Sequence, residues 1–371
     1  MKNILVNFLN RKGGTNAYAY EMTKGLVENG GNVYAIVSEQ NDRLDEWKKL
    51  ALKGLIIIPT YTNKYDFFIN SIKFYFRDRF KVKKIIDKID IDVVYTPHFH
   101  PWFRFINNMK PKAKKIITVH DPIPHSGSFF KNKLIWIAEK KDLKKADELI
   151  ILSNIFKKYM IETYNKSSDN IHVIPHGAFV YYKNKQANNY IDIYDNDKIN
   201  FLFFGRIEPY KGLNILAKAY RKISKKYKNV SLTVVGSGDF SPYKNEYKDL
   251  VNFRLINRWI DDSEIGSFFC GKNIVTVLPY LNATQSGVIN IAMMYKSLII
   301  ASNTGGLKEQ VQDKITGLLV IPNSEDSLAK AMEFVINNQT ECLKYITQAS
   351  EFLLTLDWKK LSKILLNIIE K

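Results

Sequence analysis

Short apolar stretches separated by longer segments of helical periodicity run through most of this chain. Residues 3–8 form one such stretch, and residues 15–28 carry apolar side chains at every third or fourth position until two glycines interrupt them. A second apolar stretch follows at 32–37. The start of the chain therefore predicts a strand, an amphipathic helix and a second strand in succession.

The same alternation continues along the rest of the chain. Further strands are predicted at 54–58, 92–96, 115–119, 148–152, 171–174, 201–204, 231–235, 252–256, 274–277, 298–301 and 317–320. Short buried strands that alternate with helices favour parallel sheets covered by helices on both faces. We therefore expect an α/β protein with doubly wound sheets, whose ligand sites lie at the carboxyl ends of the strands.

The pattern is interrupted between 181 and 198, where polar residues rich in Asn, Lys and Asp show no clear period. We predict two domains, 1–180 and 199–350, joined by a linker at 181–198. Residues 351–371 are predicted to be helical. They include an amphipathic helix at 358–369 that could pack on either domain.

Composition indicates a folded protein with an anionic partner. The 371 residues are 46% hydrophobic and 25% charged, and they carry a net charge of +18. Residues 1–180 hold +12 of this charge, and the remainder holds +6. The first half is therefore expected to face the partner, which charge alone leaves open among nucleic acid, anionic lipid and a phosphorylated acceptor.

The sequence also bears on location. The N-terminal apolar run is too short for a signal peptide, and no apolar stretch reaches the ~20 residues that a membrane span needs. The two cysteines, Cys270 and Cys342, form neither a metal-ligand spacing nor a disulfide framework. We expect a cytoplasmic protein that is peripheral at the inner face of the cell membrane.

One segment of the first half, 64–88, combines aromatic and basic residues. It holds eight Lys or Arg against three Asp, and Phe68, Ile72, Tyr75 and Phe76 recur at helical spacing. Such a helix suits an anionic membrane interface. The alternative is a helix whose aromatic side faces the core and whose basic side faces water. Nucleic acid is a third interpretation, but no nucleic-acid-binding motif is present.

All six histidines lie between 98 and 176. His98, His120 and His176 follow predicted strands, so parallel pairing would bring them to one edge of a sheet. His120 is the strongest site candidate of the three, because a proline-rich turn follows it. An ordinary polar role is favoured for His125 and His172. The spacings match no metal-ligand set, so no metal site is expected.

Four loops at predicted strand ends combine glycine with cations or small polar residues. They are Asn10–Thr15, Gly205–Gly212, Gly236–Gly238 and Thr284–Gly287. Glycine lets a ligand approach the backbone, and free amides at a helix N-terminus favour phosphate. Arg206 and Lys211 could hold a diphosphate from two sides. Each loop alone could equally be a plain turn, but their shared position favours a phosphate site.

These stretches resemble a known family. FFGRIEPYKG (203–212), VVGSGD (234–239) and ATQSGVINIAMMYKSLIIASNTGGLKEQVQDKITGLLV (283–320) look like the donor domain of retaining glycosyltransferases of family 4. NRKGGTNAYAYEMTKGLVENGGNVYAIVS (10–38), ITVHD (117–121) and VIPHG (173–177) resemble its acceptor domain. The resemblance implies a GT-B fold, with two Rossmann-like domains, an active site in the cleft between them, and a last helix crossing back to the N-terminal domain.

The resemblance also implies roles for individual residues. Arg206 and Lys211 would stabilise the leaving nucleotide diphosphate, and His120 would contact the transferred sugar as the third catalytic residue. The implied donor-binding residues are Gly14, Gly205, Gly236, Gly238, Arg258, Ser286, Gly287 and Glu309. The implied acceptor-binding residues are Gly13, Thr15, Asn16, His98 and Asp121. No cofactor is implied, and the donor would be a nucleotide-diphosphate sugar, most simply a UDP-sugar.

One departure from the family concerns two carboxylates. Many members carry two Glu eight residues apart near the donor sugar and ribose, and these positions fall at about Ala283 and Ile291 here. Recognition of the ribose is therefore left open. Glu309 is a candidate replacement.

The expected function is sugar transfer, with retention and without a metal, to a lipid-linked or glycan acceptor. The setting would be synthesis of capsule, O-antigen or exopolysaccharide, with an anionic membrane surface and no nucleic acid as partner. Two alternatives stay open. One is a nucleotide-sugar epimerase on the same fold, and the other is a non-catalytic partner subunit, which the missing carboxylates favour.

Overall fold

The computed structural model describes residues 1–371 except 124–132, 180–193, 196 and 272, and it contains two compact units. Leu356–Lys371 joins the described residues before Ala178 in the first unit, and the described residues of Ala178–Thr355 form the second. The second unit extends past the predicted end at 350, because α15 (Gln339–Thr355) continues unbroken. Of the predicted linker, 181–198, only 194, 195, 197 and 198 are among the described residues.

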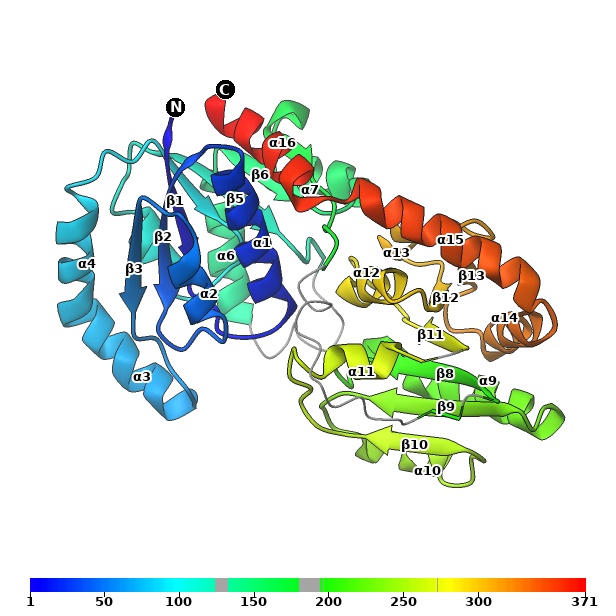
Figure 1. The fold of residues 1–371 in the computed structure, drawn as a ribbon. Helices are drawn as coiled ribbons and strands as arrows, with labels where there is room; N and C mark the ends of the chain where they lie inside the picture. Colours follow the sequence, from blue (N-terminus) through cyan, green and yellow to red (C-terminus); the bar gives the residue numbers. More distant parts are fainter. Residues whose placement is uncertain (124–132, 180–193, 196, 272) are drawn as a thin grey trace. The chain divides into compact units, whose positions relative to one another are not determined.

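The first unit is built on a seven-stranded parallel sheet in the order β3-β2-β1-β4-β5-β6-β7 (Figure 1). Its strands are β1 (Asn3–Phe8), β2 (Asn32–Ser38), β3 (Gly54–Ile58), β4 (Val93–Thr96), β5 (Lys114–Val119), β6 (Glu148–Ile151) and β7 (Ile171–Val173). These strands confirm the predicted ones. The strand order reverses between β1 and β4, and ligands bind outside the carboxyl ends of strands at such a point.

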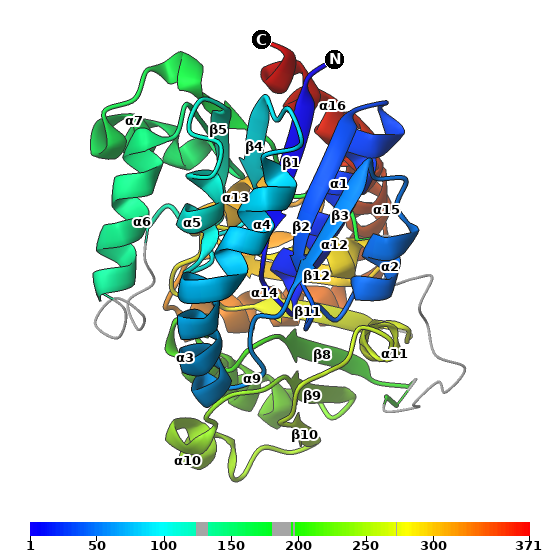
Figure 2. The ribbon, with the colours of Figure 1, turned by 90° about the vertical axis from the view of Figure 1, so that its left-hand side faces the viewer.

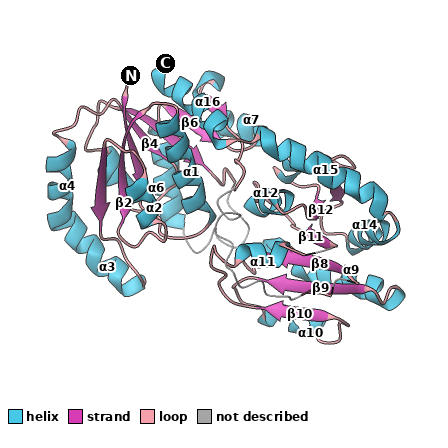
Figure 3. Ribbon diagram, viewed as in Figure 1, coloured by secondary structure: helices cyan, strands magenta, loops and turns pink. Residues whose placement is uncertain are grey.

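Helices pack on this sheet (Figure 3). They are α1 (Gly14–Glu28), α2 (Leu44–Lys49), α3 (Lys64–Lys73), α4 (Arg79–Ile86), α5 (Phe103–Asn107), α6 (Lys133–Lys145), α7 (Lys157–Tyr164) and α16 (Trp358–Glu370). One core cluster joins Leu5 and Val94 of the sheet to Phe74, Val82 and Ile86. The segment 64–88 is therefore amphipathic, with one side in the core.

The second unit repeats the plan with a six-stranded parallel sheet in the order β10-β9-β8-β11-β12-β13. Its strands are β8 (Ile199–Phe204), β9 (Val230–Val235), β10 (Phe253–Ile256), β11 (Ile274–Leu278), β12 (Leu298–Ser302) and β13 (Leu318–Val320). Its other helices are α9 (Leu213–Lys226), α10 (Lys244–Tyr247), α11 (Ile265–Phe269), α12 (Gly287–Met294), α13 (Leu307–Gln310) and α14 (Glu325–Asn337). The order reverses between β8 and β11, and both units confirm the predicted doubly wound α/β class.

The C-terminal helix α16 belongs to the first unit and lies along α1 (Figures 1 and 2). The two helices meet closely at Gly25, where a Cβ atom would lie 2.3 Å from the Ser362 hydroxyl oxygen. The backbone N–H of Lys2 donates to the Glu370 carboxylate at 3.2 Å. Apolar spacing alone left the partner of this helix open between two domains, whereas the family resemblance implied the N-terminal one, and α16 packs on α1 of the first unit.

No helix in the described ranges is both long and apolar enough to cross a bilayer. Within the described residues, neither Cys270 nor Cys342 forms a disulfide. Burial raises the pKa of the Cys342 thiol to about 11, so this cysteine is protonated at neutral pH.

Candidate functional site

The carboxyl ends of β4 and β5 place two histidines together in the first unit. The His98 and His120 ring centroids lie 5.0 Å apart. The His98 Nδ1 atom lies 2.6 Å from the Asn10 side-chain nitrogen, at the end of β1. The predicted gathering of histidines at one sheet edge is therefore confirmed, and it lies beside the β1/β4 reversal.

His120 is held as a neutral imidazole. Its Nε2 atom lies 2.9 Å from the Pro97 carbonyl oxygen. A carbonyl only accepts, so Nε2 carries the proton and Nδ1 has a lone pair that can accept a hydrogen bond. Burial, with a smaller contribution from His98 and His176, lowers the pKa of His120 to about 3. At neutral pH this side chain can therefore orient a hydroxyl group but supplies no positive charge.

Tyr18 of α1 connects the histidines to the C-terminal helix, a role that the sequence did not suggest. Its buried ring lies 4.7 Å from the His120 ring, 5.5 Å from His176 and 5.4 Å from Trp358, centroid to centroid. Its hydroxyl lies 3.4 Å from the Thr118 hydroxyl. In the sequence Tyr18 is one apolar residue of a helical stripe, and only tertiary packing shows what it touches.

The loop after β1 ends in a glycine, and a second glycine and a buried asparagine follow it on α1. Gly13 has a left-handed φ of 87° and precedes α1, and a Cβ atom on Gly14 would meet nothing within 4 Å. Gly14 is the first residue of α1, and Thr15 is the second. The Asn16 side chain is buried and donates to the Asn41 side-chain oxygen at 2.8 Å. Asn16 thus holds the loop in place. Its predicted role in binding the acceptor substrate stays a prediction.

Asp121 is exposed next to His120, and its negative charge raises the pKa of the Glu139 carboxyl group. The sequence did not single out Glu139. Burial, together with the charges of Asp121 and Asp142, raises the pKa of Glu139, on α6, to about 7. A carboxyl group with a pKa near neutrality can exchange a proton at working pH. Glu139 is therefore an additional candidate beside the predicted residues.

The remaining histidines separate into two groups. His172 pairs with Glu148 at 2.9 Å, which confirms an ordinary polar role, and His125 lies outside the described residues. His100 is buried, and its Nε2 atom has no hydrogen-bond partner within the described ranges. Burial lowers its pKa to about 3. Within the same ranges, no three His, Cys, Asp or Glu side chains converge as a metal-ion site.

In the second unit the glycine loops after β8 and β9 pack on each other. A Cβ atom on Gly236 would lie 1.8 Å from the Gly205 carbonyl oxygen, and one on Gly238 would lie 2.3 Å from that of Ile207. All three glycines have positive φ, at 134°, 145° and 153°. The glycines are therefore needed for contact between two backbones. This reason differs from the ligand approach that the sequence suggested.

Arg206 and Lys211 stand on the loop that follows β8. The Arg206 side chain is 69% exposed, and its guanidinium lies 3.5 Å from the Glu208 carboxylate. The Lys211 ammonium lies 3.7 Å from the centroid of the Tyr280 ring and 5.0 Å from that of Tyr210. One cation is thus open to solvent, and the other is held over aromatic rings by cation–π attraction.

The Gln310 side chain, from α13, hydrogen-bonds to the backbone of the loop that precedes α12. The Ser286 backbone N–H donates to the Gln310 side-chain oxygen at 2.8 Å, and the Gln310 amide donates back to the Ser286 carbonyl at 3.1 Å. The Ser286 N–H would therefore have to exchange Gln310 for a phosphate, and its donation to a donor phosphate stays a prediction. Gly287 is the next residue and the first of α12.

Apolar core residues stand at the two positions where many family members carry Glu. Ala283 and Ile291 are both buried. Close to them, the Gln285 side-chain oxygen is buried and has no hydrogen-bond partner within the described part of the chain. A buried acceptor without a partner costs free energy unless a ligand or water satisfies it. Gln285 is therefore a further candidate for binding a donor hydroxyl.

Two other predicted donor residues lie on separate elements. Arg258 follows β10 and forms a two-pronged ion pair with Glu264, at 2.9 and 2.5 Å. Glu309 is exposed on the short helix α13, directly before Gln310. Arg258 would have to leave Glu264 to bind an anion, so its donor role has the weaker structural support.

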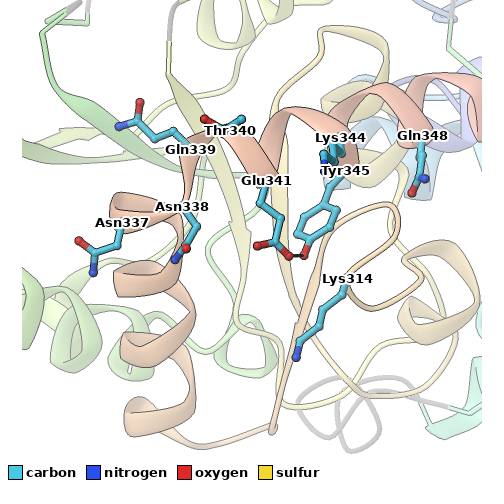
Figure 4. Close-up of a pocket in the computed structure, with 9 residues that line it drawn as sticks. All are labelled: Lys314, Asn337, Asn338, Gln339, Thr340, Glu341, Lys344, Tyr345 and Gln348. Atoms are coloured by element: carbon cyan, nitrogen blue, oxygen red, sulfur yellow. Dashed lines mark hydrogen bonds between the residues drawn. The ribbon is translucent and has the colours of Figure 1, made fainter.

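A polar cavity of about 610 Å³ opens elsewhere in the second unit (Figure 4). It is lined by Lys314, Asn337, Asn338, Gln339, Thr340, Glu341, Lys344, Tyr345 and Gln348. It lies where α14 ends and α15 begins, and none of the predicted site residues lines it. Its lining residue Lys314 precedes β13 in the chain, whereas Arg206 and Lys211 follow the carboxyl end of β8.

Two family models match consecutive parts of the chain. Glycosyltransferase Family 4 matches residues 12–178, and Glycosyl transferases group 1 matches residues 189–352. Together they span most of the sequence in the order that the resemblance implied. The boundary between them falls in the polar segment between the two units.

Individual proteins agree with these matches. An uncharacterized glycosyltransferase of Methanocaldococcus jannaschii is 23% identical over 88% of this chain and 86% of its own. The lipopolysaccharide 1,2-N-acetylglucosaminetransferase of Salmonella typhimurium is 25% identical over 61% of this chain and 58% of its own. An Anabaena structure in complex with UDP and glucose superposes with a TM-score of 0.72, at 14% identity and 99% coverage of both chains. The fold is thus that of GT-B glycosyltransferases.

Proposed function

Because the chain belongs to the glycosyltransferases of family 4 and group 1, we propose that it transfers a sugar from a UDP-sugar to a lipid-linked or glycan acceptor. One observation carries the donor part of this proposal. Arg206 and Lys211 share a loop at the carboxyl end of β8, beside the strand reversal. The Anabaena neighbour, which is in complex with UDP, supports a nucleotide of this kind.

The two cations act on the leaving group. When the bond between the sugar C1 atom and the diphosphate oxygen breaks, negative charge grows on that oxygen. Arg206 and Lys211 stabilise this charge more than they stabilise the intact donor, which lowers the barrier. The acceptor hydroxyl oxygen bonds to C1 on the same face, and its proton passes to the departing phosphate oxygen. The anomeric configuration is therefore retained, and the step uses no metal or cofactor.

His120 orients the transferred sugar. Because Nε2–H donates to the Pro97 carbonyl, Nδ1 can accept a hydrogen bond from a sugar hydroxyl. Tyr18 fixes the plane of the imidazole by edge contact. A neutral imidazole has a direction but no charge, which suits selection of the sugar better than proton transfer.

The biological setting that we propose is synthesis of a surface polysaccharide, such as a capsule, O-antigen or exopolysaccharide. The Salmonella relative acts on lipopolysaccharide, which is a lipid-anchored glycan. A transferase for such acceptors works at a membrane surface. We accordingly place the protein at the inner face of the cell membrane, as a peripheral protein without nucleic acid as a partner.

Replacement of Arg206 by Ala tests the catalytic assignment. We expect turnover to fall at least ~100-fold, which corresponds to about 2.7 kcal/mol of lost transition-state stabilisation. The readout is release of UDP from a UDP-sugar in the presence of a membrane extract as the acceptor source. Arg254→Ala, an exposed arginine on β10 that has no assigned role, is the matched control. Turnover of Arg206→Ala close to that of the control would refute the role.

The same assay separates the two rival functions. An epimerase would convert a UDP-sugar into a different UDP-sugar when no acceptor is present. A non-catalytic subunit would show saturable binding of a UDP-sugar, measured as a rise in melting temperature, without transfer to any acceptor pool. Either result would replace the transferase proposal.

A further inference from the structure

The segment formed by α3, the π-helical turn Phe74–Asp78 and α4 has two apolar sides. One side is in the core: the Phe74 ring stacks on Trp102 at 4.7 Å, and Val82 and Ile86 lie in the same cluster. Trp102 also donates from its indole nitrogen to the Ser71 hydroxyl at 3.0 Å. One apolar stripe of this segment is therefore already buried in the core of the first unit.

A second apolar stripe on the same segment faces solvent. We call this stripe the aromatic row, and it consists of Tyr65, Phe68, Ile72, Tyr75, Phe76 and Phe80. Apart from the adjacent pair Tyr75 and Phe76, its members are three or four residues apart, so they lie along one face of the helix. Phe68 is 65% exposed and Phe76 is 72% exposed. All exposed Phe and Tyr side chains of the described residues belong to this row, so the exposure is concentrated in one place.

A row of cations runs beside the aromatic row. This basic row consists of Lys73, Arg77, Lys81, Lys84 and Lys88, which are exposed and again three or four residues apart. Arg79 lies across the aromatic row, with its guanidinium 4.1 Å from the Tyr75 ring centroid and 4.7 Å from that of Phe80. Acidic side chains are few here, and Asp78 and Asp87 are paired with Arg77 and Lys83.

The π-helical turn brings the two apolar sides into register. A π turn holds one more residue than an α turn, so it shifts the phase of the following side chains. Phe74 enters the core next to Tyr75 and Phe76, which are exposed. Without the extra residue, the apolar positions of α4 would be rotated relative to those of α3. The turn thus lies within the exposed stripe, which runs from Tyr65 to Phe80, and at the start of the core stripe, which runs from Phe74 to Ile86.

We propose that the aromatic row and the basic row together dock on an anionic phospholipid surface. The aromatic side chains enter the boundary between headgroups and acyl chains, and the cations contact the lipid phosphates. A protein partner would require a shaped counterface, whereas two straight parallel rows match a planar interface that is apolar below and anionic above. The purpose of this docking rests on the proposed function, since it would hold the enzyme where a lipid-linked acceptor is found.

Co-sedimentation of the full chain with vesicles tests the proposal. We expect binding to vesicles of phosphatidylcholine mixed with phosphatidylglycerol, weaker binding to phosphatidylcholine alone, and release as salt rises, because salt screens the basic row. The double variant Phe68→Ser/Phe76→Ser should bind the mixed vesicles at least ~10-fold more weakly, since each buried phenyl ring contributes strongly to transfer from water. Lys73→Glu/Lys81→Glu should lose a similar factor.

Matched controls exist in the second unit. Leu343→Ser/Leu354→Ser removes two exposed apolar side chains from α15, and Lys225→Glu/Lys248→Glu reverses two exposed cations. Both controls should bind vesicles as the unchanged protein does. Because all of these positions are exposed, melting temperatures should stay within a few degrees of the starting value, about the effect of ordinary surface substitutions.

The outcomes distinguish this surface from the proposed function. The Phe68→Ser/Phe76→Ser protein should keep the rise in melting temperature that UDP causes, and Arg206→Ala should keep vesicle binding. Vesicle binding without any UDP effect would support the surface and refute the donor assignment. Equal binding by the row variants and the controls would overturn the proposal, as would no binding at low salt. Loss of a dimer in light scattering, with vesicle binding unchanged, would assign the rows to a second copy and also overturn it.

Discussion

Lys211 is the residue whose chemistry depends most on its immediate neighbours. Its ammonium lies 3.7 Å from the Tyr280 ring centroid, and Tyr280 is fully buried. The Tyr280 hydroxyl lies 3.4 Å from the Ser286 hydroxyl at the start of α12. A ring fixed by its surroundings restricts a flexible lysine side chain that would otherwise sample many rotamers. We therefore regard Tyr280 as a positioning residue for Lys211.

Substitution of Tyr280 tests this positioning. Tyr280→Phe keeps the ring, so kcat/KM should stay within about threefold of the starting enzyme. Tyr280→Leu removes the ring, and kcat/KM should fall ~5- to 30-fold, which is the range of a partly desolvated cation–π contact. Steady-state kinetics with a UDP-sugar is the measurement.

The phenylalanine variant is what separates positioning from simple packing. Equal losses in Tyr280→Phe and Tyr280→Leu would contradict the ring's role and assign the effect to the hydroxyl. A leucine variant with unchanged kcat/KM would show that Lys211 needs no aromatic neighbour.

At the scale of elements, the contact between α1 and α16 is the most exacting in the first unit. A Cβ atom on Gly25 would lie 2.3 Å from the Ser362 Oγ atom and 2.8 Å from the Trp358 carbonyl oxygen. Gly177, which directly follows His176, leaves no more room, since its Cβ would lie 2.4 Å from the Trp358 ring. Two glycines thus let α16 seat its first turn beside Tyr18 and His176.

Two glycine-to-alanine changes in α1 should have opposite effects. In a helix interior, Gly→Ala normally stabilises by about 0.5–1 kcal/mol. Gly14→Ala should follow this rule or be neutral, because its Cβ meets nothing within 4 Å. Gly25→Ala should instead destabilise by about 1–3 kcal/mol, because α16 must move away. Chemical denaturation of both variants is the measurement, and a stabilised Gly25→Ala protein would refute the close contact.

The hydrophobic pattern predicted the strands and the helical state of 64–88, but it did not predict which side of that helical segment is buried. Parallel strands are buried on both sides, so they are continuous apolar runs that stand out in the sequence. The 64–88 segment was expected to be helical, but its apolar residues serve two faces. Helical spacing could not say which of Phe68 and Phe74 is buried. Contact with Trp102 decides this, and Trp102 lies far along the chain.

For the molecule as a whole, the sum of titrating groups sets how stability depends on pH. Glu139 is a group with a large shift, because burial and two nearby carboxylates raise its pKa from 4.5 to about 7. In the unfolded chain it would ionise near its ordinary value. Between these two values the folded state binds more protons, so the contribution of Glu139 to stability is full below pH 4.5 and is lost as pH rises through 7.

Glu139→Gln should remove this dependence. At pH 8 the variant should be more stable than the starting protein by about 2–4 kcal/mol, and near pH 4 the difference should vanish. Melting temperatures across this pH range give the comparison. Glu162→Gln, an exposed carboxylate on α7, is the control and should show no such trend. A difference that grows toward acid pH would contradict the assigned direction.

The sequence by itself determined the strands, the two α/β units and the loops that carry the candidate chemistry, because these depend on local runs of apolar residues and on glycine at strand ends. It placed His98 and His120 on one edge, since parallel strands bring their carboxyl ends together. It also predicted Arg206 and Lys211 on one loop. All of these features are determined by residues that are close together in the sequence.

Only the tertiary structure decided which side chains restrain the site. Tyr18 and Trp358 meet His176 across most of the chain, Gln310 takes the Ser286 amide, and Tyr280 holds Lys211. These contacts join residues from separate elements, and no local pattern encodes which buried ring or amide a distant partner will meet. The choice depends on how the helices fill the space above each sheet, which is a property of the folded core.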